Sequence, residues 1–190
     1  MTTERHPFEP FLPGNARVLF LGSFPPQPKR WSMDFYYPNW INDFWRICGL
    51  VFFGDKGHFE VAGEKRFDKE RIMDFCREKG FALFDTATEI RRLADNASDK
   101  FLEVVTPTDL PALLEKIPQC RSIVTTGQKA TDTLCQAHGC PAPPVGGWVS
   151  VQIAGRTYQF WRLPSTSRAY PLSLEKKAAA YRTFFESLSI

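Results

Sequence analysis

The chain has 190 residues, of which 43% are hydrophobic and 24% are charged, which is the composition of an ordinary globular protein. This excludes a disordered or fibrous chain. The length predicts a single domain over residues 1–190, with residues 1–15 as a polar, proline-rich N-terminal arm. Against 21 Asp and Glu there are 24 Lys and Arg, a net charge of +3, which permits a nucleic-acid partner without requiring one.

The N-terminal residues contain no apolar signal-peptide segment, and no apolar run reaches the ~18 residues that a membrane span needs. We therefore expect an intracellular, cytoplasmic protein with no membrane partner. The five cysteines include no CxxC pair, so we expect reduced thiols and neither a metal nor a cofactor.

Short apolar runs alternate with amphipathic segments along the chain. The runs predict buried strands at residues 16–21, 81–84, 122–125, 149–153 and 158–162. Helices are predicted at residues 42–51, 69–78, 110–117, 127–136 and 173–188. The alternation indicates an α/β fold, a three-layer α/β/α sandwich around a central, largely parallel, four-stranded sheet.

Ligands of such sheets bind beyond the carboxyl ends of the strands. The segments predicted at that edge are residues 22–26, 85–88, 126–128 and 163–168. Asp85 is the acid placed most firmly there, whereas Asp95 and Asp99 are expected on a solvated, charged face. We expect His6, His58 and His138 away from this edge, which argues against nucleophilic catalysis assisted by histidine.

Each of these segments has a structural and a functional interpretation. Residues 22–26 form either a rigid strand exit or a tight turn that lets the backbone approach a ligand. Residues 35–45 are rich in Tyr and Trp, so they either roof the core or offer stacking faces to a base. Asn42 and Asp43 could also simply cap the following helix.

Two later segments also have both a structural and a functional interpretation. The hydroxyl groups of residues 165–167 either hold phosphates or cap the last helix. Gly127 and Lys129 begin a helix whose N-terminus could attract an anion, which by itself is a weak signal.

Taken in this order, the segments resemble the uracil-DNA glycosylase superfamily, and most closely its hypoxanthine-DNA glycosylase branch, family six. The matching residues are Gly22-Ser23-Phe24-Pro25, Phe35-Tyr36-Tyr37, Asn42-Asp43-Phe44-Trp45, Asp85, Arg91, Gly127-Gln128-Lys129-Ala130 and Leu163-Pro164-Ser165-Thr166-Ser167. The resemblance covers roughly residues 16–188. The chain departs from the branch at Pro26, at residues 38–41 and at residues 168–170, so the preferred base could differ from the one in the family name.

The resemblance implies a monofunctional DNA glycosylase. It would excise hypoxanthine or uracil from double-stranded or single-stranded DNA in base excision repair, as a monomer. Asn42 is the implied catalytic residue, which orients the attacking water. The implied base-binding residues are Gly22, Ser23, Phe24, Pro25, Tyr36, Tyr37 and Asp85. The implied DNA-binding residues are Lys29, Arg30, Gly127, Lys129, Ser165, Thr166, Ser167, Arg168 and Tyr170, with Arg168 and Tyr170 as candidates for a wedge in the duplex.

Two positions favour a different function. Phe24 stands where other branches of the superfamily place Asp or Asn, and Leu163 where active relatives often place His. These apolar residues favour a catalytically weak or inactive, glycosylase-like module that binds nucleic acid. A hydrolase of small N-glycosides on the same fold is a third candidate, and it would not need the wedge.

Overall fold

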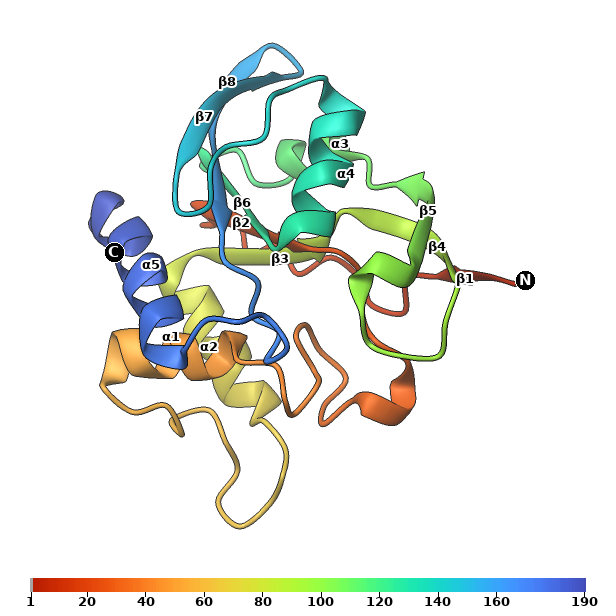
Figure 1. Cartoon of the computed structure of the whole chain (residues 1–190). Helices are drawn as coiled ribbons and strands as arrows, with labels where there is room; N and C mark the ends of the chain where they lie inside the picture. The colour runs from red at the N-terminus through yellow and green to blue at the C-terminus, as the bar shows by residue number, and fades with distance from the viewer. Residues whose placement is uncertain (1) are drawn as a thin grey trace.

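The computed structural model describes residues 2–190, and a five-stranded sheet forms its centre (Figure 1). The strands, in spatial order, are β3 (Phe81–Asp85), β2 (Val18–Gly22), β6 (Ser122–Thr126), β8 (Arg156–Leu163) and β7 (Trp148–Ile153). The first four run parallel, and β7 pairs antiparallel with β8. The predicted α/β fold with a largely parallel sheet is confirmed. The four parallel strands are joined by β7 as a fifth.

Helices cover both faces of this sheet, which gives the three layers seen in Figure 1. One face carries α1 (Phe44–Phe53), α2 (Lys69–Lys79) and α5 (Leu174–Ser187), and the other carries α3 (Leu110–Glu115) and α4 (Gln128–His138). Local chemistry sets their ends, because Asp68, Asp109 and Ser173 accept hydrogen bonds from the first turns of α2, α3 and α5.

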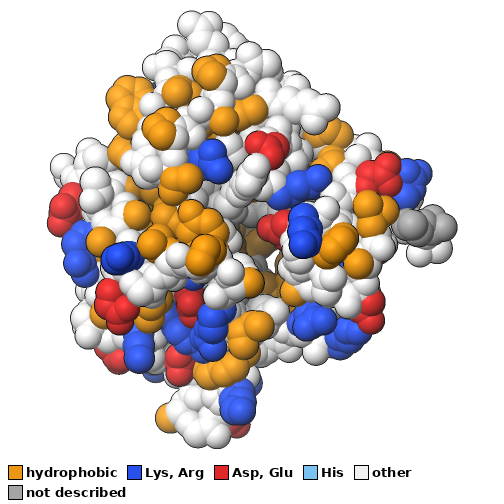
Figure 2. Space-filling model, viewed as in Figure 1, with side chains coloured by type: hydrophobic (Ala, Val, Ile, Leu, Met, Phe, Trp, Pro, Cys, Tyr) orange, Lys and Arg blue, Asp and Glu red, His pale blue; other side chains and the backbone are white. Residues whose placement is uncertain are grey.

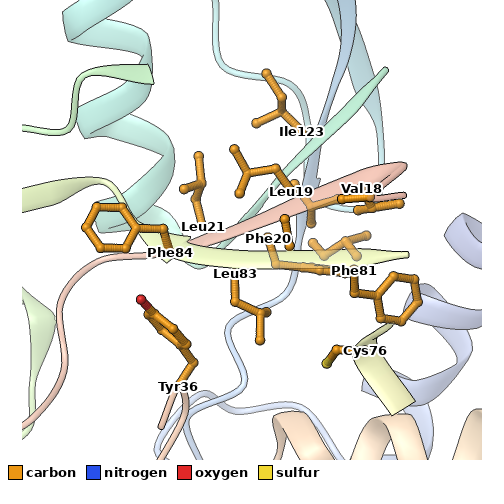
Figure 3. Packing of buried hydrophobic residues seen from close by; sticks show 14 of the residues in the cluster. Val18, Leu19, Phe20, Leu21, Tyr36, Cys76, Phe81, Leu83, Phe84 and Ile123 are labelled. Atoms are coloured by element: carbon orange, nitrogen blue, oxygen red, sulfur yellow. The ribbon is translucent and has the colours of Figure 1, made fainter. Parts of the chain in front are cut away.

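The core is built on β2, whose five residues are all buried. Successive side chains of a strand point to opposite faces, and Figure 3 shows this: Leu19 and Leu21 lie on one side with Ile123, whereas Phe20 lies on the other side with Leu83. Both faces are covered by helices, so the strand sequence is continuously apolar rather than alternating.

A second, smaller sheet was not predicted from the sequence. It is antiparallel, in the order β1 (Thr3–Arg5), β4 (Ala87–Arg92) and β5 (Leu102–Pro107), and a one-turn helix η2 (Asp99–Phe101) lies in the connection between β4 and β5. Pairing with β4 fixes the N-terminal arm, which also forms a bridge between Phe11 and Leu83. The arm therefore packs along β3.

Within residues 2–190, no helix combines the length and the apolar character needed to cross a lipid bilayer.

Candidate functional site

A cavity of about 820 Å³ opens at the carboxyl ends of the parallel strands. Figure 2 shows a hollow near the middle of this face, with acidic and basic side chains at its rim. Residues from all four of the predicted segments line it, although Asp85 alone represents the segment 85–88. The parallel topology explains this, because strands far apart in the sequence end at one edge.

Most of the predicted site residues line this cavity. They are Gly22, Ser23, Phe24, Pro25, Tyr36, Tyr37, Asn42, Asp85, Gly127, Lys129, Ser165, Thr166, Ser167 and Tyr170. Lys29, Arg30 and Arg168 lie outside the lining.

Lys29 belongs with Arg30 to the one-turn helix η1 (Pro28–Arg30). The ammonium group of Lys29 lies 2.9 Å from both carboxylate oxygens of Asp95. This hydrogen bond holds the pKa of Asp95 below its usual value.

Gly22 allows two side chains to meet at the end of β2. A Cβ atom at this position would lie 2.7 Å from Oδ1 of Asp85 and 3.5 Å from the phenol oxygen of Tyr37. The carbonyl oxygen of Gly22 accepts hydrogen bonds from both the backbone N–H and the hydroxyl group of Thr86. The turn is therefore fixed to the end of β3, and the absence of a side chain makes room for Asp85.

Tyr37 is held in one orientation. Its ring stacks on Phe44, with ring centroids 4.0 Å apart and an interplanar angle of 6°, and its hydroxyl group is 2.8 Å from that of Thr126. Its φ of 52° is in the left-handed region, which is uncommon for a bulky residue, and strained backbone of this kind clusters at functional sites. Burial raises the pKa of the Tyr37 phenol, which therefore stays protonated.

Asn42 joins the first turn of α1 to the loop that follows β8. Its Oδ1 accepts a hydrogen bond from the backbone N–H of Phe44, the first residue of α1, at 3.0 Å. The N-cap position itself is Asp43, whose side chain makes no capping hydrogen bond, so the capping interpretation fails for Asp43, and Asn42 binds the helix start from one position before the cap. Asn42 also forms a β-bridge with Ser167, and the N–H of Asp43 donates to the carbonyl oxygen of Thr166. The segment 42–43 and the loop 165–168 are thus held together.

Asp43 is buried among three cationic groups. Its Oδ1 lies 3.1 Å from Arg168 and 3.4 Å from Arg46, and its Oδ2 lies 3.7 Å from the ammonium group of Lys177. The side chain of Lys177 is only 1% exposed. Burial lowers the pKa of Lys177, and Asp43 opposes this shift. We call Asp43, Arg46, Arg168 and Lys177 the Asp43 cluster.

His6 contacts the edge from which it was expected to be absent. Its Nε2 lies 2.6 Å from Oδ2 of Asp85, and its side chain is 4% exposed. The ring packs against Phe84 and Phe24, with centroid separations of 4.5 and 5.2 Å. The expectation failed because the pairing of β1 with β4, which brings His6 to Asp85, was not visible in the sequence.

Asp99 also differs from its expected place on a solvated face. It lines the cavity with Arg92, Lys100 and other residues of the connection between β4 and β5. Burial, and to a lesser extent the carboxylate of Asp85, raises the pKa of Asp99, whereas a hydrogen bond with Ser23 and the charges of Lys129 and Arg92 act in the opposite direction. Sequence reasoning missed this residue because β4 and β5 were not predicted.

Phe24 and Leu163 bring no polar group to the cavity. Phe24 packs in a small apolar cluster with Ala87, Ile90 and Leu102, and Leu163 is 1% exposed. Any polar chemistry at this edge therefore has to come from neighbouring side chains and from the backbone. Among residues 2–190, no three His, Cys, Asp or Glu side chains are grouped so that they could hold a metal ion.

No family model and no curated protein matches this chain. Among solved structures, the chain is similar to a protein from Methanosarcina acetivorans that was solved by solution NMR and named "putative Uracil DNA glycosylase". The two sequences are 23% identical, the match covers 100% of both chains, and the TM-score is 0.67. The chain therefore has the same fold as that protein along its whole length.

Proposed function

We propose that this protein is a monofunctional DNA glycosylase that removes a deaminated base, hypoxanthine or uracil, by hydrolysis of the N-glycosidic bond. The observation that carries the proposal is the convergence of the sequence segments on one cavity. These are the segments whose residues resemble the uracil-DNA glycosylase superfamily. The similar fold of the Methanosarcina acetivorans protein named "putative Uracil DNA glycosylase" supports the same proposal.

A base inside a duplex is inaccessible, so the enzyme has to extrude the damaged nucleotide into the cavity. Tyr37 is the proposed stacking partner. Its orientation is already fixed by Phe44 and Thr126, so little conformational entropy is lost when a base binds. Tyr36, Asp85 and the backbone of residues 22–25 would contact the edges of the base.

Asn42 is the proposed catalytic residue. Its carboxamide oxygen uses one lone pair for the N–H of Phe44, which leaves a second lone pair to orient water. A carboxamide is too weakly basic to deprotonate water, so it can act only by positioning the nucleophile below a sugar that has already become cationic. We therefore expect slow turnover.

DNA would be held around the rim of the cavity. Ser165, Thr166 and Ser167 are proposed to bind backbone phosphates, and Lys29, Arg30, Gly127 and Lys129 are proposed to add affinity that depends on salt concentration. Tyr170 is the stronger candidate for the wedge, because Arg168 would have to leave its ion pair with Asp43 in order to enter the duplex.

A second function, binding of nucleic acid without cleavage, is favoured by one specific observation. Phe24 and Leu163 are both buried and apolar, so neither can orient water or stabilise a departing base anion. Binding of a duplex without release of any base would support this alternative.

The deciding experiment is base excision from labelled duplexes that carry one uracil, hypoxanthine or xanthine. Wild-type protein should leave an abasic site that breaks only after alkali treatment, and borohydride should trap no covalent protein–DNA adduct.

Two variants of Asn42 test its proposed role. Asn42→Ala should lose excision. Asn42→Ser should also lose it, because serine can cap the helix but lacks the reach of the carboxamide. Asn15→Ala, whose side chain binds the carbonyl oxygen of Arg77 far from the cavity, is the control. Full activity of Asn42→Ser would contradict the catalytic role of Asn42 and leave it only the structural role of binding the start of α1.

A further inference from the structure

We infer that His6 is a positioning residue, which holds Asp85 so that the second oxygen of its carboxylate accepts a hydrogen bond from a ring N–H of the extruded base. The inference rests on the proposed glycosylase function and deepens it, because it names the group of the base that the cavity reads. It depends on the N-terminal arm, which carries His6 and lies outside residues 16–188, where the family resemblance is found.

The arm fixes His6 without help from the cavity. The backbone N–H of His6 donates to the carbonyl oxygen of Thr88 at 2.8 Å, directly after the pairing of β1 with β4. The side chain is 4% exposed, and its ring packs against Phe84 and Phe24. The ring is therefore in place before any ligand binds.

Both ring nitrogens of His6 have partners. Nε2 lies 2.6 Å from Oδ2 of Asp85. Nδ1 lies 3.0 Å from the carbonyl oxygen of Phe8 and 3.1 Å from the backbone N–H of the same residue. A charged ring donates from Nδ1 to that carbonyl oxygen, and a neutral ring with its proton on Nε2 accepts the N–H of Phe8 instead. His6 can thus donate to Asp85 in either protonation state.

The contact with His6 leaves the other carboxylate oxygen of Asp85 for a ligand. Within residues 2–190, the hydrogen bond of this carboxylate uses Oδ2, and the hydroxyl group of Thr108 fixes the main-chain carbonyl oxygen of Asp85 at 2.6 Å. Oδ1 lies at the end of β2, where a Cβ atom on Gly22 would be 2.7 Å from it and 3.5 Å from the phenol oxygen of Tyr37. Asp85 and Tyr37 both line the cavity, so a base that stacks on Tyr37 brings one edge to Oδ1.

A carboxylate in this place selects the edge of the base by its polarity. An ionised carboxyl group only accepts hydrogen bonds, so Oδ1 attracts an N–H group and repels a ring nitrogen that carries a lone pair. Deamination makes this exchange: N1 of adenine and N3 of cytosine are acceptors, whereas the same atoms of hypoxanthine and uracil carry hydrogen. A fixed Asp85 therefore favours the deaminated base and disfavours the intact one by repulsion.

His6 is needed because the selection depends on orientation. Without the donor at Oδ2, the carboxylate of Asp85 is free to rotate and Oδ1 loses its fixed direction. Misplacement of a binding group by about 1 Å can cost ~100-fold in rate. His6 thus acts on the base through Asp85, without touching it.

The first test compares bases in the wild-type protein. Labelled duplexes carry uracil, 3-methyluracil, hypoxanthine or 1-methylhypoxanthine, and single-turnover rates are measured with enzyme in excess. Each methyl group replaces the N–H that Oδ1 is inferred to bind. Whichever parent base is excised, its methylated form should react at least ~100-fold more slowly, as expected for a site built to bind an N–H group. Equal rates would overturn the inference.

Two variants of His6 separate positioning from packing. Asparagine keeps a polar atom at the level of Nδ1 but does not reach Oδ2 of Asp85, whereas glutamine places its amide nitrogen at the level of Nε2. His6→Asn should lose about 100-fold in the single-turnover rate and much of the discrimination against the methylated base, with unchanged affinity for an undamaged duplex. His6→Gln should keep most of both. His58→Asn, which alters a ring stacked on Phe53 outside the cavity lining, is the matched control.

An unchanged rate and discrimination in His6→Asn would overturn the inference, as would equal losses in His6→Asn and His6→Gln. If His6→Asn does not fold, folded His6→Gln decides by itself: retained rate and discrimination support the donor at Oδ2, and loss of both contradicts it. If wild-type protein releases no base, the proposed function fails separately, and binding of the same duplexes decides. Tighter binding of the parent base than of its methylated form, weakened in His6→Asn, would support the inference, and equal binding would contradict it.

Discussion

Two aspartates in and beside the cavity have opposite surroundings: Asp99 lines the cavity, whereas Asp43 lies outside the lining, next to Asn42, which belongs to it. Asp43 is packed among Arg46, Arg168 and Lys177, whereas Asp99 faces the carboxyl group of Asp85. The first arrangement compensates a buried charge and joins α1, α5 and the loop after β8. The second leaves a carboxyl group that retains its proton to higher pH. The same residue type therefore compensates buried cations beside the cavity in one place and, in the other, lines the cavity with a carboxyl group whose pKa is raised.

The positions of the two groups in the fold explain the difference. The Asp43 cluster draws its cations from three separate segments, and the Lys177 ammonium group also donates to the carbonyl oxygen of Ser167. Asp99 lies on the connection between two strands of the small sheet, where the charges of Lys129 and Arg92 only partly offset the effects of burial and of Asp85 on its pKa. Satisfied ion clusters give rigidity, whereas incompletely neutralised acids are typical of sites where protons are transferred.

The largest effect should come from Asp43→Asn. The variant keeps the shape of the side chain but leaves the buried ammonium group of Lys177 without its counter-charge, whereas Arg46 keeps its ion pair with Glu60. Breaking a buried ion pair in this way costs about 3–5 kcal/mol. Urea unfolding measures the loss. Asp74→Asn, which removes an exposed pair with Arg77, should change stability by about 0–1 kcal/mol. Equal stability of the two variants would mean that the Asp43 cluster does not stabilise its wall.

Gly22→Ala tests the opposite wall. The new Cβ atom would lie 2.7 Å from Oδ1 of Asp85, and His6 restrains the escape of that side chain. We expect destabilisation of about 1–3 kcal/mol, as for overpacking, together with loss of base excision. Gly14→Ala is the control, because a Cβ atom there meets no atom within 4 Å. An active, stable Gly22→Ala protein would show that Asp85 has no fixed place in the cavity.

Tyr37→Phe tests the hydrogen bond between the hydroxyl groups of Tyr37 and Thr126. The variant keeps the stack on Phe44 and removes the hydrogen bond with Thr126, so it should lose about 1 kcal/mol of stability and retain most excision activity. Thermal unfolding of Tyr37→Phe, Thr126→Val and the double variant would measure the coupling of the two groups. Additive effects would indicate that this hydrogen bond contributes nothing to the position of the ring.

Asp99→Asn should give the smallest effect on stability, with a sign opposite to that of Asp43→Asn. The pKa of Asp99 is raised above its ordinary value of 3.8 in the folded protein, so the unfolded chain loses this proton first as the pH rises. Wild-type stability therefore falls above pH 3.8 and the penalty persists at neutral pH. The variant avoids the penalty. It should melt at a slightly higher temperature than wild-type protein at pH 7, with a difference that shrinks toward the ordinary pKa. A lower melting temperature at pH 7 would show that charged Asp99 stabilises the fold.

The sequence predicted much of the central architecture. Continuous apolar runs identified the strands because strands buried on both faces need no polar residues. The helix ends also followed local rules, since Ser173 and Asp109 accept hydrogen bonds from helix N–H groups and Gly80 adopts the left-handed conformation after α2. The segments at the carboxyl ends of the strands then followed from the parallel arrangement.

The small antiparallel sheet could not be predicted from the sequence. The strand β4 carries Glu89, Arg91 and Arg92 with only partly buried side chains, and its partner β1 has three residues. Neither segment has the apolar pattern of a strand when taken alone. Their pairing depends on contacts across more than 80 positions of the chain, which no local pattern encodes.

The sequence by itself determined the α/β class, the positions of the main strands and helices, and the set of segments that meet at one edge, because local hydrophobicity and backbone preferences specify them. Only the tertiary structure decided which charges surround each acid. It brought His6 to Asp85, cations to Asp43, and Asp99 into the cavity. Protonation depends on burial and on neighbouring charges, and both arise from contacts between segments that are distant in the chain.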